Sequence, residues 1–170
     1  MKIQNILIML LLACCMIFSA CEDKDYPAGI PELEHHYYIV YVPNNNSEVS
    51  VNRDETDLLK LPVQFYSSFT RSYDAVAHYT LLTTGIADPA VLGEDFEIVD
   101  ANGNNVSASD GKYAITFPRA IQATDTIYIK MLNNPLPGSR SVQINLEDNI
   151  TNDFRVDIFS TAFRRTLVIN

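Results

Sequence analysis

The chain has 170 residues, and its 12 lysines and arginines against 21 aspartates and glutamates give a formal net charge of −9 at pH 7. An acidic surface repels nucleic acid and anionic membranes, so we expect no nucleic-acid partner. All three cysteines, Cys14, Cys15 and Cys21, lie near the N-terminus. The rest of the chain therefore has no disulfide, no thiolate metal site and no cysteine nucleophile.

The N-terminus carries an export signal. An apolar run from Ile6 to Ala20 follows the positive charge of Lys2 and ends just before the polar segment 22–25. This run is shorter than the roughly 20 apolar residues that cross a bilayer. A basic start, an apolar centre and small residues at the end are typical of a secretory signal peptide, so we expect residues 1–20 to be removed.

Phe18-Ser19-Ala20-Cys21 resembles the lipobox of bacterial lipoproteins, although Phe18 stands where Leu is usual. The resemblance implies that Cys21 is the lipid attachment site and the mature N-terminus. The rival match, Leu11-Leu12-Ala13-Cys14, would start the mature chain on an apolar segment. The alternative is a secreted protein with Cys21 as a free thiol, and a lone exported thiol is prone to oxidation, which favours lipidation.

Residues 21–35 are predicted to form an acidic flexible tether. The segment holds five acids, Pro27, Gly29 and Pro31, and it has too little apolar content to pack a core. An acidic run after the lipidated cysteine also resembles the surface-export signal of Bacteroidota-type lipoproteins. That likeness implies a lipid-anchored protein on the outer membrane, facing the cell exterior.

Residues 36–170 are predicted to form a single all-β domain. Short β-rich runs alternate with clusters of Pro, Gly, Asn and Asp, and no run has a helical period. Seven to nine strands in this length predict an immunoglobulin-like two-sheet sandwich. The predicted strands are Tyr37–Val42, Glu48–Val51, Leu58–Tyr66, Val76–Leu82, Phe96–Val99, Tyr113–Phe117, Thr126–Leu132, Ser141–Leu146 and Arg164–Ile169.

Two runs alternate clearly. Ile127, Ile129 and Met131 should face the core and Tyr128 and Lys130 the solvent; likewise Val142, Ile144 and Leu146 should oppose Gln143 and Asn145. Pro62 predicts an edge strand or a bulge. Residues 84–92 have room for one helical turn, and Asp110-Gly111 is a hairpin signal.

The second half resembles a Calx-β domain. The likeness rests on Gly93-Glu-Asp-Phe96, Tyr113–Pro118, Asp125–Leu132 and Ser141–Leu146, in that order. Many Bacteroidota surface lipoproteins carry such a sandwich and are encoded near SusC/SusD-type nutrient importers. The whole chain looks like one of these.

Calx-β domains bind calcium through clustered carboxylates, because this ion takes six to eight oxygen ligands. Of those positions the chain keeps Asp95, helped by Glu94. Asn133, Asn134 and Arg140 stand where the family has acids. Glu94 and Asp95 are therefore only weak metal candidates, and we expect no metal and no cofactor; capping of backbone N–H groups is the better interpretation of Asp95.

The sequence contains no catalytic signature, which predicts that the protein is not an enzyme. His78 is expected to be a half-buried strand residue. Asp54, Glu55 and Asp57 are expected to lie in a loop, and such clustered loop acids are expected to be solvated. The segment from Tyr66 to Tyr73 combines aromatic rings, hydroxyl groups and a cation on an exposed connection. Phe69, Arg71 and Tyr73 are the candidate ligand-binding residues.

The sequence therefore predicts a non-catalytic outer-membrane lipoprotein. It would act as an accessory binding or assembly subunit beside a SusC/SusD-type importer, with a glycan or peptide as the partner and the membrane contacted through its lipid. The alternative is a calcium-dependent adhesion or matrix module of the Calx-β type. The missing acids around Asp95 oppose that alternative.

Overall fold

The computed structural model describes residues 36–67, 74–119, 122–152 and 154–170. All of them belong to the compact unit His35–Asn170. Every regular element in these ranges is a strand, and no helix there is long and apolar enough to cross a membrane. The strands are β1 (His36–Tyr41), β2 (Glu48–Val51), β3 (Leu59–Ser67), β4 (Ala75–Leu82), β5 (Phe96–Val99), β6 (Tyr113–Phe117), β7 (Gln122–Met131), β8 (Arg140–Glu147), β9 (Asn149–Ile150), β10 (Arg155–Ile158) and β11 (Arg164–Ile169).

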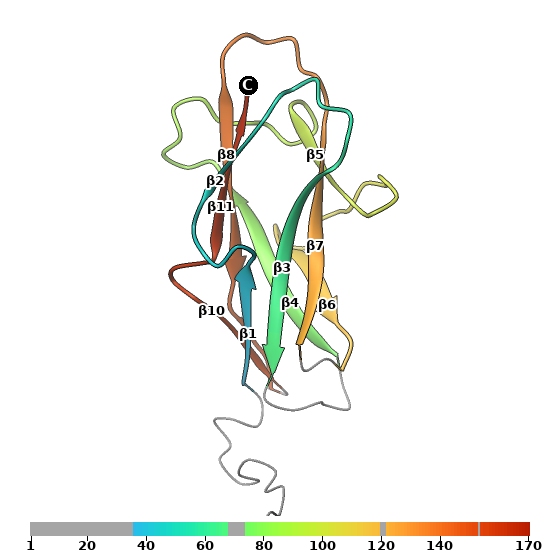
Figure 1. Ribbon diagram of the computed structural model, residues 1–170, viewed down its shortest axis with the longest axis vertical. Helices are drawn as coiled ribbons and strands as arrows, with labels where there is room; N and C mark the ends of the chain where they lie inside the picture. The colour runs from blue at the N-terminus through green and yellow to red at the C-terminus, as the bar shows by residue number, and fades with distance from the viewer. Residues whose placement is uncertain (1–35, 68–73, 120–121, 153) are drawn as a thin grey trace, which may run out of the picture. The chain divides into compact units, whose positions relative to one another are not determined.

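The strands form two sheets that face each other (Figure 1). The first sheet has the order β5-β7-β3-β1-β10-β9, and the second has the order β2-β11-β8-β4-β6. Most neighbours are antiparallel, but β1 pairs with β10 and β2 pairs with β11 in parallel. The predicted all-β two-sheet sandwich is confirmed.

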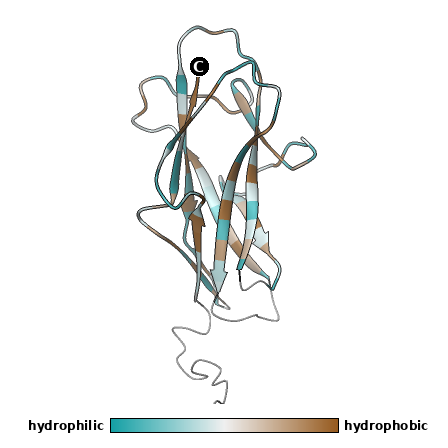
Figure 2. Cartoon of the chain, viewed as in Figure 1, coloured by the Kyte–Doolittle hydropathy of each residue, from teal (hydrophilic) through white to brown (hydrophobic). Residues whose placement is uncertain are grey.

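The core lies between the sheets, because each strand turns alternate apolar residues inward (Figure 2). The predicted alternation of β7 is confirmed, since Ile127, Ile129 and Met131 are buried and Lys130 is exposed. Phe65 of β3 stacks on Phe117 of β6 across the two sheets, with ring centroids 4.7 Å apart. Each fully buried side chain of this size contributes about 1.5–3 kcal/mol, so this layer holds the sheets together.

Four predicted strands, β2, β5, β6 and β11, have the predicted boundaries. β7 begins four residues earlier than predicted, at Gln122, because its polar first half is also hydrogen-bonded to β3. The short strands β9 and β10 were not predicted, since neither has a long apolar run. The Asp110-Gly111 turn is confirmed: both residues have positive φ, and Ser109 and Lys112 exchange two backbone hydrogen bonds.

Two expectations for the second sheet are wrong. The segment 84–92 contains a turn and a bridge from Pro89 to Ser141 instead of a helical turn. Asn145, expected to face solvent, is 9 % exposed because Thr80 and Arg164 flank it on the neighbouring strands.

Pro62 does not mark an edge strand, because β3 lies between β1 and β7. The carbonyl of Pro62 accepts a hydrogen bond from the Val42 N–H at 2.9 Å, so the backbone of Pro62 faces the β1 side. The paired part of β1 ends one residue earlier, at the Tyr41–Val63 pair. The N–H that proline lacks is therefore not needed by the ladder, which is why an interior strand tolerates Pro62.

Arg165 of β11 points into the core together with Leu167 and Ile169 and is 2 % exposed. Its guanidinium donates to the backbone carbonyls of Pro43 and Asn45 and lies over the ring of Tyr41, 4.6 Å from the centroid. The Tyr41 hydroxyl in turn donates to the Ile144 carbonyl at 3.1 Å. Arg165 thus links the second sheet to the connection between β1 and β2.

We predict that Arg165→Leu lowers the free energy of unfolding by about 3 kcal/mol, because it removes the donor to the Pro43 and Asn45 carbonyls in part-buried hydrogen bonds and the contact with the Tyr41 ring. The matched control is Arg164→Leu on the opposite face of the same strand, which should cost less than about 1 kcal/mol. Urea unfolding of both variants measures the difference. Equal losses in the two variants would show that the hydrogen bonds of Arg165 contribute no more to stability than the contacts of Arg164 do.

Candidate functional site

Four of the predicted site residues lie outside the described residues. These are the lipid attachment site Cys21 and the ligand-binding candidates Phe69, Arg71 and Tyr73. They stay predictions. The described part of the chain does include Glu94, Asp95 and the residues that replace the acids of the Calx-β pattern.

Asp95 is buried and held by three donors, whereas its neighbour Glu94 is exposed. The Val91 N–H donates to its Oδ2 at 2.7 Å, the Asn134 side-chain amide donates to Oδ1 at 2.8 Å, and Arg140 Nη1 lies 3.3 Å from Oδ2. Asp95 therefore caps a backbone N–H and pairs with a cation. Both carboxylate oxygens are engaged inside the protein.

The same end of the sandwich therefore offers little to a calcium ion, which takes six to eight oxygen ligands. Arg140 and Asn134 bring a positive charge and an N–H donor to the carboxylate that would bind the ion. Among the described residues, no group of three or more His, Cys, Asp and Glu side chains is placed to hold a metal. The donor set around Asp95 does not fit calcium.

A second feature of this end is an open groove of about 870 Å³ beneath the connection between β2 and β3. Its walls come from the end of β2, the start of β3, the outer side of β7 and the C-terminal residue. The lining residues are Ser50, Val51, Asn52, Glu55, Asp57, Leu58, Leu59, Lys60, Ala101, Tyr128 and Asn170.

Arg53 fixes the rim of this groove. Its Nε and its backbone N–H both donate to the Asn170 carbonyl at 3.0 Å. Its guanidinium also donates to the carbonyls of Asn134, Leu136 and Gly138 in the loop between β7 and β8. One side chain thus ties together three segments, so the groove is formed before any ligand arrives.

The groove combines an aromatic face with polar groups of both signs. Tyr128 and Lys60 are directly opposite on β7 and β3, and both project from the outer face of the first sheet. Glu55 and Asp57 lie on the facing loop, where Glu55 Oε1 accepts the N–H groups of Thr56 and Asp57. Such a surface can stack on an apolar face and hydrogen-bond the edges of a bound molecule.

The sequence pointed to part of this groove. It predicted that Tyr128 faces outward and that Glu55 and Asp57 lie in a loop, but it did not place them together. Their proximity depends on the path from β2 in one sheet to β3 in the other, which no local pattern encodes. Lys60 and Asn170 carried no signal of their own.

A polar cluster on the outer face of the second sheet is the other place that could suggest chemistry. Glu147 accepts a hydrogen bond from the Thr80 hydroxyl and one from Lys112 Nζ, both at 2.8 Å, and His78 lies opposite it. Burial, together with the Lys112 charge, lowers the pKa of His78 below its ordinary value, and Glu147 offsets only part of this effect. His78 is half-buried in its strand, as expected, and the cluster joins β4 to β8.

No protein-family model and no curated protein matches the chain. Among solved structures, the Calx CBD2 domain superposes with a TM-score of 0.50 at 9 % identity, covering 78 % of this chain and 85 % of that domain. The apo-form Calx CBD1 domain gives 0.47 at 12 % identity, covering 79 % and 97 %. A two-domain protein of unknown function from Bacteroides fragilis gives 0.48 at 13 % identity, covering 84 % of this chain and 47 % of that protein.

These likenesses concern the fold. The domain is an all-β two-sheet sandwich that resembles Calx-β domains, as the motifs from Gly93 to Leu146 predicted. At such identities the comparison assigns no family.

We predict that millimolar calcium shifts the midpoint of thermal unfolding by less than about one degree relative to a chelator. An ion bound only by the folded state would add about 2.7 kcal/mol at a hundredfold excess over Kd, a shift of several degrees. The double variant Asn134→Asp, Arg140→Asp restores acids beside Asp95 and should gain such a calcium-dependent shift. A wild-type shift of about five degrees or more would instead favour the adhesion module.

Proposed function

We propose that this protein is a non-catalytic outer-membrane lipoprotein that acts as an accessory binding or assembly subunit beside a nutrient importer of the SusC/SusD type. Lipid at Cys21 would hold it to the outer membrane, facing the exterior. The ligand would be a short glycan or peptide, with no cofactor. This proposal rests on the export signal, the β-sandwich and above all the groove at Tyr128.

The groove suits such a ligand because its parts match the two surfaces of a sugar or a short peptide. The Tyr128 ring and Leu58 offer an apolar wall. Asn52, Glu55 and Lys60 offer an amide, a carboxylate and an ammonium group to hydroxyl or peptide groups. Because Arg53 already orders the rim, binding would cost little conformational entropy.

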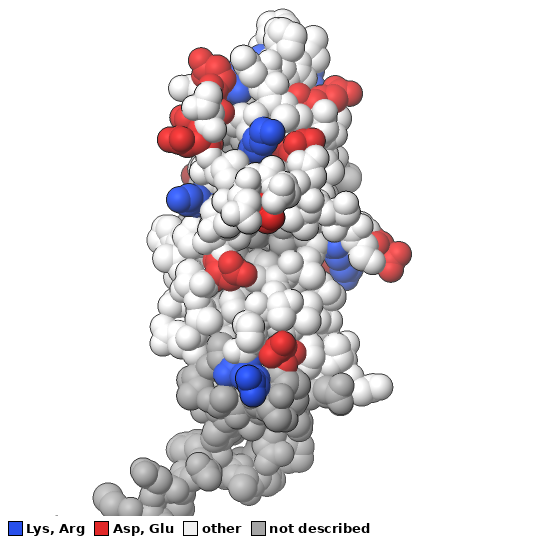
Figure 3. Space-filling model, turned by 90° about the vertical axis from the view of Figure 1, so that its right-hand side faces the viewer, with Lys and Arg blue, Asp and Glu red and all other residues white. Residues whose placement is uncertain are grey.

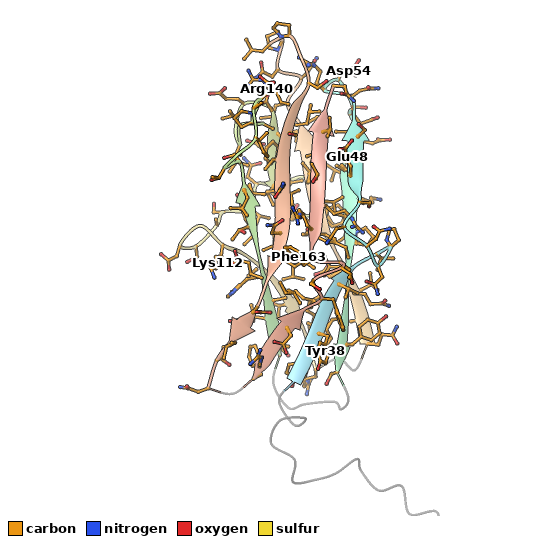
Figure 4. The ribbon with its side chains drawn as sticks, turned by 90° about the vertical axis from the view of Figure 1, so that its left-hand side faces the viewer. Tyr38, Glu48, Asp54, Lys112, Arg140 and Phe163 are labelled. Carbon is orange, nitrogen blue, oxygen red and sulfur yellow. The ribbon has the colours of Figure 1, made fainter. Side chains whose placement is uncertain are left out.

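The position of the groove also supports tethered capture. Figure 4 labels Asp54 and Arg140 at one end of the domain and Tyr38, in the strand that the N-terminal segment joins, toward the other. Glu55 of the groove directly follows Asp54, so the groove lies at the end of the domain away from the start of β1. A lipid at Cys21 with a flexible tether would give the groove a high effective concentration near a membrane partner.

We predict that Tyr128→Ala weakens binding of the ligand by about tenfold or more, because the stacking wall is lost. The probes are linear neutral tetrasaccharides and mixed-sequence tetrapeptides, measured by calorimetry on the full chain. The control is Tyr66→Ala, an exposed tyrosine on the outer face of the same sheet, which should bind as the wild type does. Equal losses in both variants, or no binding of either ligand class, would refute the groove as the site.

We predict that Cys21→Ser releases the protein from the membrane fraction. The lipid is the expected attachment, and the described domain offers no amphipathic basic helix in its place. Fractionation of cells that make either form gives the readout, with Ser19→Thr as a control that keeps the cysteine. Retention of the Cys21→Ser protein would disprove the lipoprotein assignment.

A further inference from the structure

The two sheets leave an open seam along one side of the sandwich, where β5 and β7 of the first sheet meet β6 of the second. β5 pairs with residues 128–131 of β7 and with no earlier ones. The first half of β7, from Gln122 to Ile127, is therefore paired on its β3 side alone among the described strands. β6 is the last strand of its sheet and pairs with β4.

The register shows which backbone groups of β6 face outward. The carbonyl of Val76 accepts a hydrogen bond from the Asn149 side chain on the β8 and β9 side, so Val76 faces away from β6. Thr116 pairs with Val76, and Ala114 pairs with His78. His78 lies two residues after Val76, so its backbone groups point to the same side as those of Val76. The N–H and C=O groups of Ala114 and Thr116 therefore point away from β4, toward the seam.

The facing edge of β7 is partly closed by its own side chain. Thr126 pairs with Pro62, whose backbone faces β1, so the N–H of Thr126 also points toward the seam. That N–H donates to Asp125 Oδ1 at 2.7 Å. Among the described residues no side chain caps Ala114 or Thr116 in this way, which leaves β6 as the more available edge.

A groove of about 360 Å³ runs between these two edges. Three consecutive residues of β6 line it: Ala114, Ile115 and Thr116. Because neighbouring side chains of a strand point to opposite faces, three in a row line one groove through their backbone edge. The groove shares Tyr128 and Ala101 with the candidate ligand groove, but β6 and Asp125 belong to the seam alone.

The charges in the seam are of one sign. Asp100 and Asp125 are its charged lining residues, and both are acidic. Hydrogen bonds from the side chain and backbone of Asn104 lower the pKa of Asp100, so its carboxylate remains ionised near neutral pH. On the face of the molecule that Figure 3 shows, acidic and basic side chains are scattered, and several of them lie next to one another.

The other edge strands are covered, short or carry a charge, which sets β6 apart. The free edge of β5 is covered, since the N–H groups of Gly93 and Val106 donate to the carbonyls of Phe96 and Ile98, each at 2.9 Å. β9 has two residues, and β2 carries Glu48 on its exposed side. β6 reads Tyr-Ala-Ile-Thr-Phe, with no charge, proline or glycine to block pairing.

We propose that the seam is a docking site for an extended, lysine- or arginine-bearing segment of a partner protein, which adds to β6 as a further strand. Its backbone pairs with the N–H and C=O groups of Ala114 and Thr116, and its basic side chains lie near Asp100 and Asp125. This mode of recognition takes affinity from main-chain hydrogen bonds and specificity from the flanking side chains. It goes beyond ligand capture at the Tyr128 groove and does not depend on it.

The probe is the peptide acetyl-Lys-Thr-Val-Thr-Val-Thr-Lys-amide, titrated into the full-chain protein. We expect binding at millimolar concentration or below, with amide hydrogen exchange of Ala114 and Thr116 slowed about tenfold when the peptide is bound. The same peptide with every Val and Thr amide N-methylated, and a version with Glu in place of Lys, should bind at least about tenfold more weakly. These peptide controls need no protein variant.

Thr116→Pro removes an outward N–H without breaking a bond to β4, and it should weaken binding about tenfold. Thr116→Val keeps that N–H and should bind as the wild type does, as should Lys60→Ala in the ligand groove. Asp100→Asn with Asp125→Asn should weaken binding severalfold and flatten its salt dependence. The proposal would be overturned if the basic peptide did not bind, or if the N-methylated peptide bound equally well. It would also be overturned by a protein dimer that Thr116→Pro dissociates, because a second copy of the chain would then occupy the seam.

Discussion

The buried guanidinium of Arg165 is the contact that fixes the crossing of the chain from the first sheet to the second. It reaches across the core to carbonyls in the chain between β1 and β2, where that chain passes from one sheet to the other. Asn46 of the same connection bonds the Arg164 N–H and the Ser160 carbonyl. β2 is thereby set parallel to β11, and the groove wall that begins at Ser50 follows from its position.

Arg53 does at the loop end what Arg165 does inside the core. Each arginine donates to several carbonyl groups that are far from it in sequence, and the fork of a guanidinium suits several acceptors at once. Lysine, with a compact charge on a flexible stem, would not hold such a set in fixed directions. Both ends of the connection between β1 and β3 are therefore fixed by arginine–carbonyl contacts, and the ligand groove is shaped as a consequence.

The strand pattern was largely predictable because alternation is local, and four strands have the predicted limits. The pairing partners of each strand were not predictable, because pairing depends on residues that are distant in sequence. Pro62, for example, is tolerated inside a sheet only because β1 ends beside it. Arg165 did carry a signal, since it shares the parity of Leu167 and Ile169. Arginine is usually exposed, so this pattern alone does not predict its burial. Arg165 can be buried because its guanidinium donates to carbonyl groups that only the folded chain brings near it.

Around Asp95, side chains compensate the charge of a buried carboxylate that resembles a metal ligand. A buried carboxylate requires donors or a cation, and here the chain supplies both from one neighbouring segment, through Asn134 and Arg140. The same segment is bonded to Arg53 through its carbonyls, so acid, amide and two arginines form one connected network. A bound ion would stabilise these loops only in proportion to its concentration. Because the groups around Asp95 are part of the chain, they order the loops beside the groove whenever the chain is folded.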